Sequence, residues 1–547
     1  MEQSSQDNFV FDPHNVIPLS RWYYSYHPKF NTLVDHILSD ISKTITDKKL
    51  IEFHDDLGKQ VSRLGPRAIN IPLIKSKKNT IKIKKNLNYL LCNLITAGGT
   101  YNIFDWTCFH APFGKSQYTN NTKYGKHFLT FNIFPKLMYA LVDAGYLNIA
   151  RRGYTDLRSV LKDRRETSLY PTLKFKELLI RYDILDDPEV KFIRMGSDGN
   201  PHNGLVIRTV ENSKKEKVID NTFDEHDFCD LPHENTLIEH TTEKFDLRSM
   251  RIDVMKYNEI LTNNSIILPL SQQQSYFNTM RFREITKYKK SLEILENQRK
   301  HGYIKDNEEF INKRRKILPR SKRLIYRSVN FRIGTVFRSF IKTYDLGGRF
   351  YGGWWMSLPS EYRSKILING NTTREYDITS IHPKLLCTNE ELNLDNGDFY
   401  NSKVPEEYMG ILTKDDVRSI SKKLVIVDIN NDNGRRLYQI ILNRIKHSGD
   451  YSLFSKLDIE TIETLYNEQV KLQPVFFDKL KRTKNIGISL QFIDSEICAM
   501  TLQHFVKKGI PILSVHDSFI GETNHYDEIV DVTERNLENV RAKILKI

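Results

Sequence analysis

The sequence is poor in cysteine and has no long apolar run. Its five cysteines are scattered along 547 residues without a C-x-x-C pair, which argues against a disulfide framework or a zinc ribbon. No stretch approaches the ~20 apolar residues of a membrane-spanning helix, and the first residues lack the basic and apolar regions of a secretion signal. We therefore expect a soluble intracellular protein without a membrane partner.

One short segment has a loosely metal-like spacing, from His226 through Cys229 to His233. It lies in a polar stretch and has no convincing fourth ligand, although structural zinc sites are almost always four-coordinate. We do not expect zinc there.

Negative charge is scarce relative to positive charge. The chain has 82 Lys and Arg against 68 Asp and Glu, a formal net charge of +14. This excess favours a polyanionic partner such as nucleic acid; the alternative is a coding bias that enriches Lys, Asn and Ile. Hydrophobic residues at 39% and aromatic residues at 11% argue against wholesale disorder, and the length predicts about three or four domains.

Residues 81–182 have a more regular pattern than residues 1–80, where only a helix near 30–48 stands out. Apolar spacing predicts two helices and then two strands around a basic turn, at 86–97, 134–144, 146–150 and 168–172. Such a pattern predicts a winged helix-turn-helix that contacts DNA phosphates through Arg151, Arg152, Arg164 and Arg165. The alternative is an ordinary α+β subdomain whose exposed turn is basic.

The middle of the chain divides into a linker and a basic arm. Residues 183–245 are the linker or insert, because 196–245 has the most loop-like composition. Residues 246–343 form the arm, in which 271–340 is helix-rich and basic. Its basic residues either make a solvated face or grip a duplex backbone, and the sequence leaves both interpretations open.

Two strand-like runs each deliver one carboxylate. Residues 373–376 lead into Asp377, and residues 509–515 lead into His516 and Asp517, with the two aspartates 140 positions apart. Two-metal phosphoryl chemistry needs carboxylates on rigid neighbouring strands, so that two Mg²⁺ ions lie about 3.5–4 Å apart. The sequence therefore predicts that these strands pair.

Two further segments carry cations that suit phosphates. The Gly- and aromatic-rich run 344–355 contains Arg349, and we expect its glycines to let the backbone approach a ligand closely while Arg349 forks onto a phosphate. Arg418 and Lys422 share one face of a predicted helix, with Lys423 beside them. The alternatives are a Gly-rich turn packed by aromatics and a solvated basic helix.

In this order, the residues resemble the motif set of single-subunit phage and mitochondrial RNA polymerases, which are related to family A DNA polymerases. The set is Asp345-x-x-Gly348-Arg349, Asp377, Arg418-x-x-x-Lys422 and His516-Asp517-Ser518. The run from Gly347 to Trp355 and the sequence Asp377-Ile-Thr-Ser-Ile-His-Pro look like the transposon–virus polymerase family of phages, virophages and mobile elements. The resemblance covers about residues 340–522.

The resemblance implies a role for each matching residue. Two Mg²⁺ ions, for which Mn²⁺ is a possible substitute, would bind Asp377 and Asp517. Lys422 would contact the incoming phosphates and protonate the pyrophosphate, with Arg418 and Lys423 as further phosphate ligands. Arg349 and Tyr351 would touch the template or product backbone, and His516 would lie at the primer end.

Two positions depart from the family patterns. Asn430 replaces a tyrosine expected eight positions after Lys422, and His382 stands where family A polymerases have a sugar-gate glutamate. Both residues are expected to line the nucleotide site. The bulk of His382 favours dNTPs, whereas the shorter Asn430 weakens any polar contact to the sugar, so the choice between dNTPs and NTPs stays open.

Two expectations concern the end of the chain. Asp494 and Glu496, on a predicted helix near the second carboxylate, are expected to be surface acids. The amphipathic stretch 528–545 is expected to pack on the back of the core.

We predict an α+β fold with a right-hand polymerase core. Palm and fingers occupy 344–547, the thumb-like arm 246–343, and the winged-helix domain precedes them. The predicted enzyme is a nucleotidyltransferase, a DNA polymerase or an RNA-making primase, that replicates a phage, virophage or mobile element. The alternative is a non-catalytic DNA-binding initiator with a polymerase-like scaffold, and a metal-dependent nuclease is a third, disfavoured possibility.

The expected partners follow from that function. They are a DNA template and primer, nucleoside triphosphates and, as a further candidate partner, a replicative helicase. We expect the protein in the cytoplasm or, for a mobile element of a eukaryote, in the nucleus or an organelle.

Overall fold

The computed structural model describes residues 246–300 and, with short gaps, residues 331–545. The gaps are 342, 395–397, 401–402, 431–436, 449–450 and 483–485. Before residue 209 it describes the helices and strands given below and turns beside them, and it includes parts of 307–314. The spacing around Cys229 and the basic residue Arg152 lie outside the described residues.

The chain forms two compact units. The first combines Met1–His202 with Ile267–Thr335, and the second combines Asn203–Ile266 with Val336–Ile547. The predicted arm 246–343 is therefore divided between them. Each unit mixes helices and strands, which confirms the α+β class. No helix in the described parts of the chain is both long enough and apolar enough to cross a bilayer.

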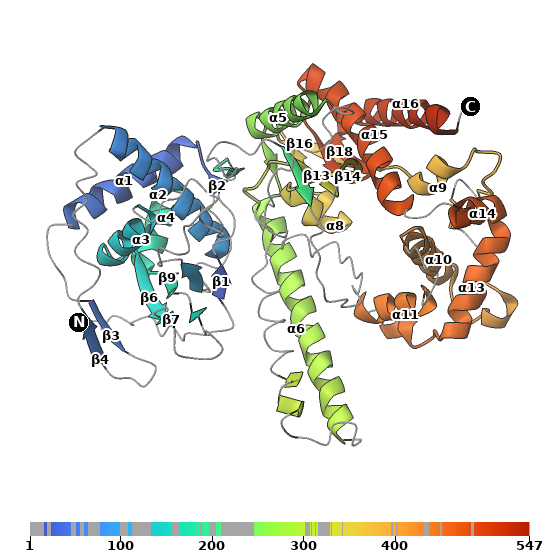
Figure 1. Ribbon diagram of the computed structural model, residues 1–547, viewed down its shortest axis with the longest axis horizontal. Coiled ribbons are helices and arrows are strands. Elements are labelled where there is room, and N and C mark those ends of the chain that lie inside the picture. Colours follow the sequence, from blue (N-terminus) through green and yellow to red (C-terminus); the bar gives the residue numbers. More distant parts are fainter. Residues whose placement is uncertain are drawn as a thin grey trace. The chain divides into compact units, whose positions relative to one another are not determined.

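The first unit surrounds a four-stranded sheet with the order β1-β5-β9-β6 (Figure 1). Its elements are β1 (Val16–Pro18), β2 (Tyr23–Tyr24), α1 (Pro28–Thr44), β3 (Ile51–His54), β4 (Gln60–Arg63), α2 (Lys77–Gly98), β5 (Cys108–Ala111), α3 (Phe134–Asp143), β6 (Leu147–Arg151), β7 (Tyr154–Thr155), β8 (Arg164–Arg165), β9 (Thr167–Pro171), α4 (Leu173–Arg181), β10 (Ile193–Arg194) and α6 (Leu270–Lys300). Apolar faces of α1 to α4 form one buried cluster that includes Phe30, Leu90, Leu141 and Phe175.

The predicted pair of strands in this unit is confirmed. β6 and β9 pair antiparallel, with Leu147 opposite Pro171, and α3 precedes them as the pattern predicted. Pro135 stands in the first turn of α3, where its missing N–H has no intrahelical partner to lose. The arginines of the wing lie at strand ends or outside the described residues, so their DNA contacts stay a prediction.

The second unit contains two sheets and a helical region. Its elements are β11 (Leu205–Arg208), α5 (Leu247–Asn263), β12 (Ile266–Ile267), β13 (Phe337–Ile341), β14 (Thr343–Tyr351), η4 (Trp354–Ser357), α8 (Ser360–Arg363), β15 (Leu367–Ile368), β16 (Asn371–Asp377), α9 (Ile381–Leu386), η5 (Glu406–Tyr408), α10 (Lys414–Ile429), α11 (Leu437–Ser448), α12 (Tyr451–Phe454), α13 (Ile459–Leu472), α14 (Pro474–Arg482), α15 (Ile486–Lys508), β17 (Ile512–Val515), β18 (Ser518–Glu522), η6 (Thr523–His525) and α16 (Tyr526–Leu545). α16 contacts β16 and β18, which confirms the packing expected for 528–545.

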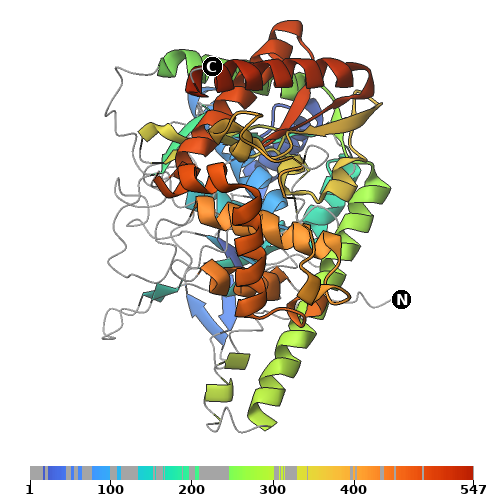
Figure 2. The same ribbon diagram turned by 90° about the vertical axis from the view of Figure 1, so that its right-hand side faces the viewer.

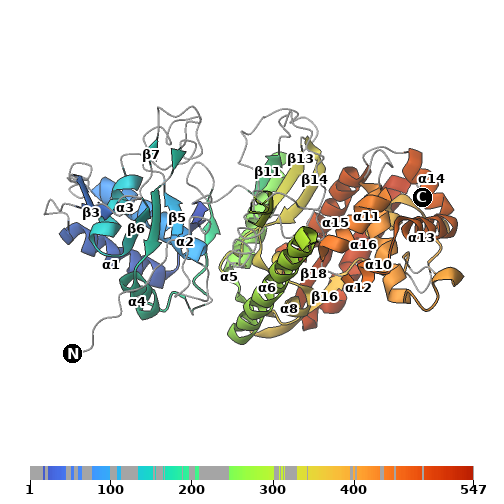
Figure 3. The same ribbon diagram turned by 90° about the horizontal axis from the view of Figure 1, so that it is seen from below.

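Two segments differ from the sequence predictions. Leu205–Arg208, in the segment predicted as a linker, forms strand β11 and pairs parallel with β13. Phe337–Ile341, within the run predicted as helical, forms β13 itself and pairs antiparallel with β14 (Figure 3). Both runs are short and rich in β-branched or aromatic residues, which favour strands. The polar and basic residues on either side made this tendency hard to recognise in the sequence.

The central sheet has the order β12-β15-β16-β18-β17. β17 and β18 are buried throughout. β17 is an edge strand, yet its outward carbonyls are satisfied: Trp355 Nε1 donates to Ser514 O at 3.0 Å, and the Tyr257 hydroxyl donates to Ile512 O at 2.7 Å. Because an uncovered edge would leave backbone groups unpaired, these two aromatics hold the edge in place.

Glycines in β14 let a helix approach the second sheet. Gly347 and Gly348 both have φ of +78°, and a Cβ on Gly348 would lie 2.7 Å from Ser495 Oγ of α15. A Cβ on Gly347 would instead meet Ser339 O and Ile341 of β13, so the neighbours at these glycines are β13 and α15 and not the ligand expected from the sequence. This close approach brings α15 alongside β14, so that Asp494 of α15 lies next to Arg349.

The helices α10 to α14 make up the helical region of the second unit, and in Figure 2 they face the viewer in orange to red. α10 and α14 share a buried cluster with α9, α15 and α16. α10 begins with a capping box, in which Thr413 Oγ1 accepts from Asp416 N and the Asp416 side chain accepts from Thr413 N. Its apolar face packs on α11 and α13 through Val417, Leu424 and Val427. The opposite face carries the predicted cations.

Candidate active site

Strand pairing brings the two predicted carboxylates together. β16 and β18 pair antiparallel with Asp377 directly opposite Ser518, and Ile378 N donates to Asp517 O at 3.3 Å. Asp517 lies in the two-residue turn that joins β17 to β18. The prediction that the two strand-like runs pair is wrong, because the run 509–515 forms β17 and β18 lies between it and β16. The two aspartates still meet, since the short turn that holds Asp517 lies at the same end of the sheet as Asp377.

The two carboxylates interact electrostatically. Asp377 is exposed at the end of β16, yet the protein packed around its carboxyl, and then the negative charge of Asp517, raise its pKa to about 6, against the opposing effect of Lys422. Strongly shifted pKa values are more common at functional sites than elsewhere, and a pair of close carboxylates is one cause of such a shift. The pair is therefore poised to accept a cation.

Backbone strain is concentrated beside these carboxylates. Four non-glycine residues in the described chain have positive φ, and two of them are Ser380 at 55° and His516 at 58°. Ser380 follows Asp377 by three positions, and His516 immediately precedes Asp517. Such conformations cost about 1–3 kcal/mol each and persist where the surroundings enforce them. At His516 the positive φ is the geometry that a two-residue hairpin turn uses, so the turn itself fixes the position of Asp517.

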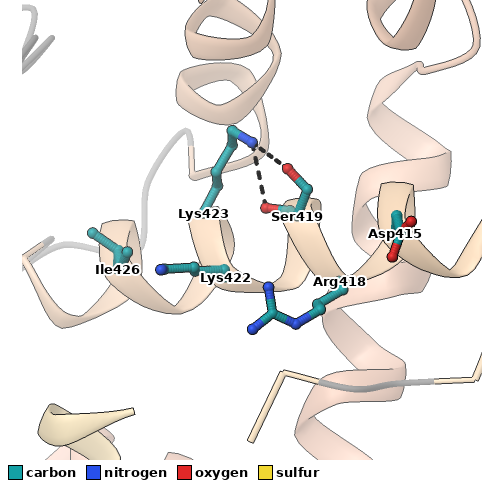
Figure 4. Close-up of a pocket in the computed structure, with 6 residues that line it drawn as sticks. All are labelled: Asp415, Arg418, Ser419, Lys422, Lys423 and Ile426. Atoms are coloured by element: carbon teal, nitrogen blue, oxygen red, sulfur yellow. Dashed lines mark hydrogen bonds between the residues drawn. The ribbon is translucent and has the colours of Figure 1, made fainter. Parts of the chain in front are cut away.

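The exposed face of α10 borders a cavity of about 500 Å³. Its lining is Asp415, Arg418, Ser419, Lys422, Lys423 and Ile426. Figure 4 shows Arg418 and Lys422 on the same side of the helix, while Lys423 turns to Ser419, whose Oγ accepts from Lys423 Nζ at 2.5 Å. The Arg418 Nε donates to the Asp398 carboxylate. The cavity thus offers cations to an anionic ligand.

The sequence suggested that the guanidinium of Arg349 is free to bind a phosphate. In the structure Asp494 holds it instead. Arg349 Nε lies 3.1 Å from Asp494 Oδ1, and its Nη2 also donates to the same carboxylate. Burial disfavours the charge of Arg349, but Asp494 more than offsets this and raises the Arg349 pKa, with a further contribution from Asp517. Arg349 therefore lies near Asp517, the second of the two predicted carboxylates.

Asp494 is buried, so the prediction that it is a surface acid is wrong. Its side chain is 0% exposed, and it also bonds His382 Nε2 at 3.0 Å. Glu496, two positions later, is half-exposed and pairs with Arg338 at 2.7 Å. Leu490, Ile497 and Cys498 share the buried helical face of Asp494; an acid on such an apolar stripe signals a buried cationic partner.

The remaining predicted residues are divided between the two units. The rings of His516 and Tyr351 are 5.5 Å apart, edge to face. His382 stands in the first turn of α9. Asn430 caps the end of α10, about two turns beyond Lys422, and its Nδ2 donates to Ile426 O at 2.7 Å. Arg151 ends β6 in the other unit.

Several residues of the site were missed by sequence reasoning. Glu375 accepts two bonds from Arg363, at 2.9 and 2.8 Å, and one from Ser518 Oγ at 2.8 Å, which ties β16 to β18 below the carboxylates. Tyr400 lies near Asp517, Asp398 and Arg418; burial first, and Asp517 next, raise its pKa. Glu375 is on a strand two positions before Asp377, and that period-2 spacing was the available signal.

Asp377 and Asp517 fit hard cations, which prefer oxygen ligands. Among the described residues no group of three or more His, Cys, Asp or Glu side chains is arranged to hold a metal. Mg²⁺ is commonly held by only one or two carboxylates together with substrate phosphates, so a pair is a sufficient donor set.

Comparison with known proteins adds no relative to these observations. The sequence matches no protein-family model and no curated protein.

Proposed function

We propose that the protein is a template-dependent nucleic-acid polymerase, either a DNA polymerase or an RNA-making primase. The observation that carries the proposal is the register of β16 and β18, which sets Asp377 and Asp517 side by side at one end of a covered sheet. The cationic face of α10 is close enough for Lys422 to counter the raised pKa of Asp377. Phosphoryl transfer needs this combination of positioning and charge neutralisation.

The carboxylate pair would hold two Mg²⁺ ions, with Mn²⁺ as a possible substitute. Bound there, the ions would neutralise charge on the attacking and leaving oxygens. Because Asp377 shares a site with a second carboxylate, a cation relieves the repulsion that raises its pKa.

The α10 face binds the triphosphate in this proposal. Lys422 is exposed on the cavity and reaches toward Asp377, so it contacts the incoming phosphates and donates a proton to the pyrophosphate. Arg418 leaves Asp398 to join it, since its side chain is already 43% exposed. Lys423, His382 and Asn430 complete the nucleotide side, and Arg349, Tyr351 and His516 face the primer and template.

The central sheet would then be the palm of a right-hand polymerase and α10 to α14 its fingers. α5 and α6 would belong to the thumb-like arm. The helix and strand pair α3, β6 and β9 support a winged-helix contact to DNA. The setting we propose is replication of a phage, virophage or mobile element, with a replicative helicase as a further partner.

Primer extension tests the proposal. A labelled primer on a short DNA template is incubated with the full-length protein and Mg²⁺, with dNTPs and NTPs in separate reactions and EDTA as the control. We expect Mg²⁺-dependent lengthening with at least one nucleotide set. No lengthening with either set overturns the proposal.

The DNA contact is tested separately, by measuring duplex affinity at several salt concentrations. Counterion release predicts an affinity that falls steeply as salt rises, and replacing Arg151 and Arg164 with Ala should make the salt dependence shallower. Strong DNA binding without any extension would favour the non-catalytic replication initiator.

A further inference from the structure

A fully buried carboxylate connects two elements that border the candidate active site. Asp494 on α15 bonds Arg349 of β14 through Nε at 3.1 Å, and His382 of α9 through Nε2 at 3.0 Å. Figure 1 shows α15 running between the elements that carry these partners. One side chain therefore fixes two others from separate parts of the chain.

Asp494 is less exposed to solvent than its partners Arg349 and His382. The Asp494 side chain is 0% exposed, whereas Arg349 is 18% and His382 16% exposed. Burying a carboxylate is costly unless it is paired and hydrogen-bonded. The neighbouring pair on the same helix has the opposite arrangement, with Arg338 3% and Glu496 36% exposed. At Asp494 the partners, and not the acid, keep surface that a ligand can reach.

The charged neighbours of Asp377 and Asp517 indicate on which side of the site Asp494, Arg349 and His382 lie. The positive charge of Lys422 opposes the rise in the pKa of Asp377, and the negative charge of Asp517 helps to raise the pKa of Arg349. If the phosphates lie between the carboxylates and α10, as the proposed function requires, the sugar and the primer end lie toward Arg349 and His382. Asp494 is behind both of them, out of reach of any ligand.

We propose that Asp494 is a positioning residue that sets sugar discrimination by fixing the His382 ring and the Arg349 fork against the sugar side of the site. An ionised carboxylate only accepts hydrogen bonds, so His382 Nε2 must carry a proton and the ring orientation is defined. A bidentate arginine is likewise fixed in its plane. The inference rests on the proposed polymerase function.

Single-nucleotide addition with dATP and with ATP, on the full-length protein, measures the ratio of the two kcat/KM values. Asp494→Asn keeps the volume and removes the charge. We expect its ratio to move toward one by about tenfold, by analogy with the lower end of the loss seen when a hydrogen-bond partner that orients a metal ligand is removed. Glu496→Gln is the matched control, since it removes an acid–arginine pair from the same helix and should leave the ratio unchanged.

His382→Phe removes the same hydrogen bond by changing its other partner. The variant keeps the bulk of the ring, loses the bond to Asp494, and leaves Asp494 paired with Arg349, so it does not depend on folding of the Asp494 variant. We expect the same shift in the ratio as for Asp494→Asn, and no further shift when the two substitutions are combined.

The outcomes separate the inference from the proposed function. If wild type adds nucleotides but the ratio stays unchanged in His382→Phe, ring bulk alone suffices and the inference is overturned while the function stands. An Asp494→Asn protein that folds and keeps the wild-type ratio has the same consequence. If wild type adds neither nucleotide, the proposed function fails and the inference with it.

Discussion

The two sides of the candidate active site are held in different ways. On the sheet side, Glu375, Arg363 and Ser518 tie β16 to β18, and strained backbone at Ser380 and His516 sets the turns beside the carboxylates. On the α10 side, the cations project into a cavity, and Arg418 pairs with Asp398 in a partly exposed ion pair. We infer that the sheet side is preorganised and that the helix side adapts when a ligand binds.

Two arginine–aspartate pairs show the contrast most clearly. Arg349 meets a carboxylate that is completely buried, whereas Arg418 is 43% and Asp398 18% exposed. An exposed pair is worth little and is easily exchanged for another anion, but a buried one cannot lose a partner without leaving an uncompensated charge. The first pair therefore suits permanent positioning, and the second suits release to a phosphate.

The largest expected effect comes from the carboxylates. Asp377→Asn or Asp517→Asn should each lower nucleotide addition by about 1,000-fold or more, about 4 kcal/mol of transition-state stabilisation, because each removes a metal ligand. Single-turnover extension measures the loss, and circular dichroism checks that the fold persists. Mg²⁺-dependent extension at the wild-type rate in either variant would refute the assignment.

The two arginine pairs should differ sharply in stability. Arg349→Met leaves Asp494 buried with only His382, so the free energy of unfolding should fall by about 3–5 kcal/mol. Arg418→Met should lower it by at most about 1 kcal/mol, because the pair is exposed. Urea unfolding of both variants gives the comparison. Equal losses would contradict the division into a fixed and an adaptable side.

A third prediction concerns the lysine on the helix side. Lys422→Ala should slow chemistry by about 100-fold, the lower range for general acid catalysis, with little change in template affinity. Lys414→Ala, at the exposed start of the same helix, is the control and should behave as wild type. A loss of template affinity as large as the loss of rate would assign Lys422 to duplex binding instead.

The smallest effect is a change in titration. In the metal-free protein the Asp377 carboxyl should titrate near pH 6, and Asp517→Asn should lower that pKa by removing a like charge. Because the folded pKa lies above the unfolded value, the stability that Asp377 contributes is full below about pH 4 and is lost as pH rises through 6. Carboxyl ¹³C NMR follows the titration; an unchanged midpoint in the variant would mean that the carboxylates do not interact.

Sequence patterns were sufficient for parts that depend on neighbouring residues. The apolar spacing around 134–144 predicted α3, the i, i+4 spacing of Arg418 and Lys422 predicted their shared face, and two strand-like runs predicted the carboxylates. Each of these signals lies within one helix or strand. Local pattern alone therefore defines an element and the side that a residue faces.

Partners that lie far apart in sequence were beyond such patterns. Asp494 bonds Arg349 across 145 positions and His382 across 112 positions. Nothing local distinguishes a buried acid of this kind from a surface acid except the apolar residues on its own helical face. The strand at 205–208 was hidden for a similar reason, since its partner β13 is more than 100 positions away.

Templated addition of one nucleotide tests the central claim most directly. Four primer–templates that differ only in the first template base are each incubated with Mg²⁺ and one nucleotide at a time. The account predicts that only the complementary nucleotide is added efficiently and that the preference changes with the template base. Addition that ignores the template base, or no addition on any of the four templates, would contradict it.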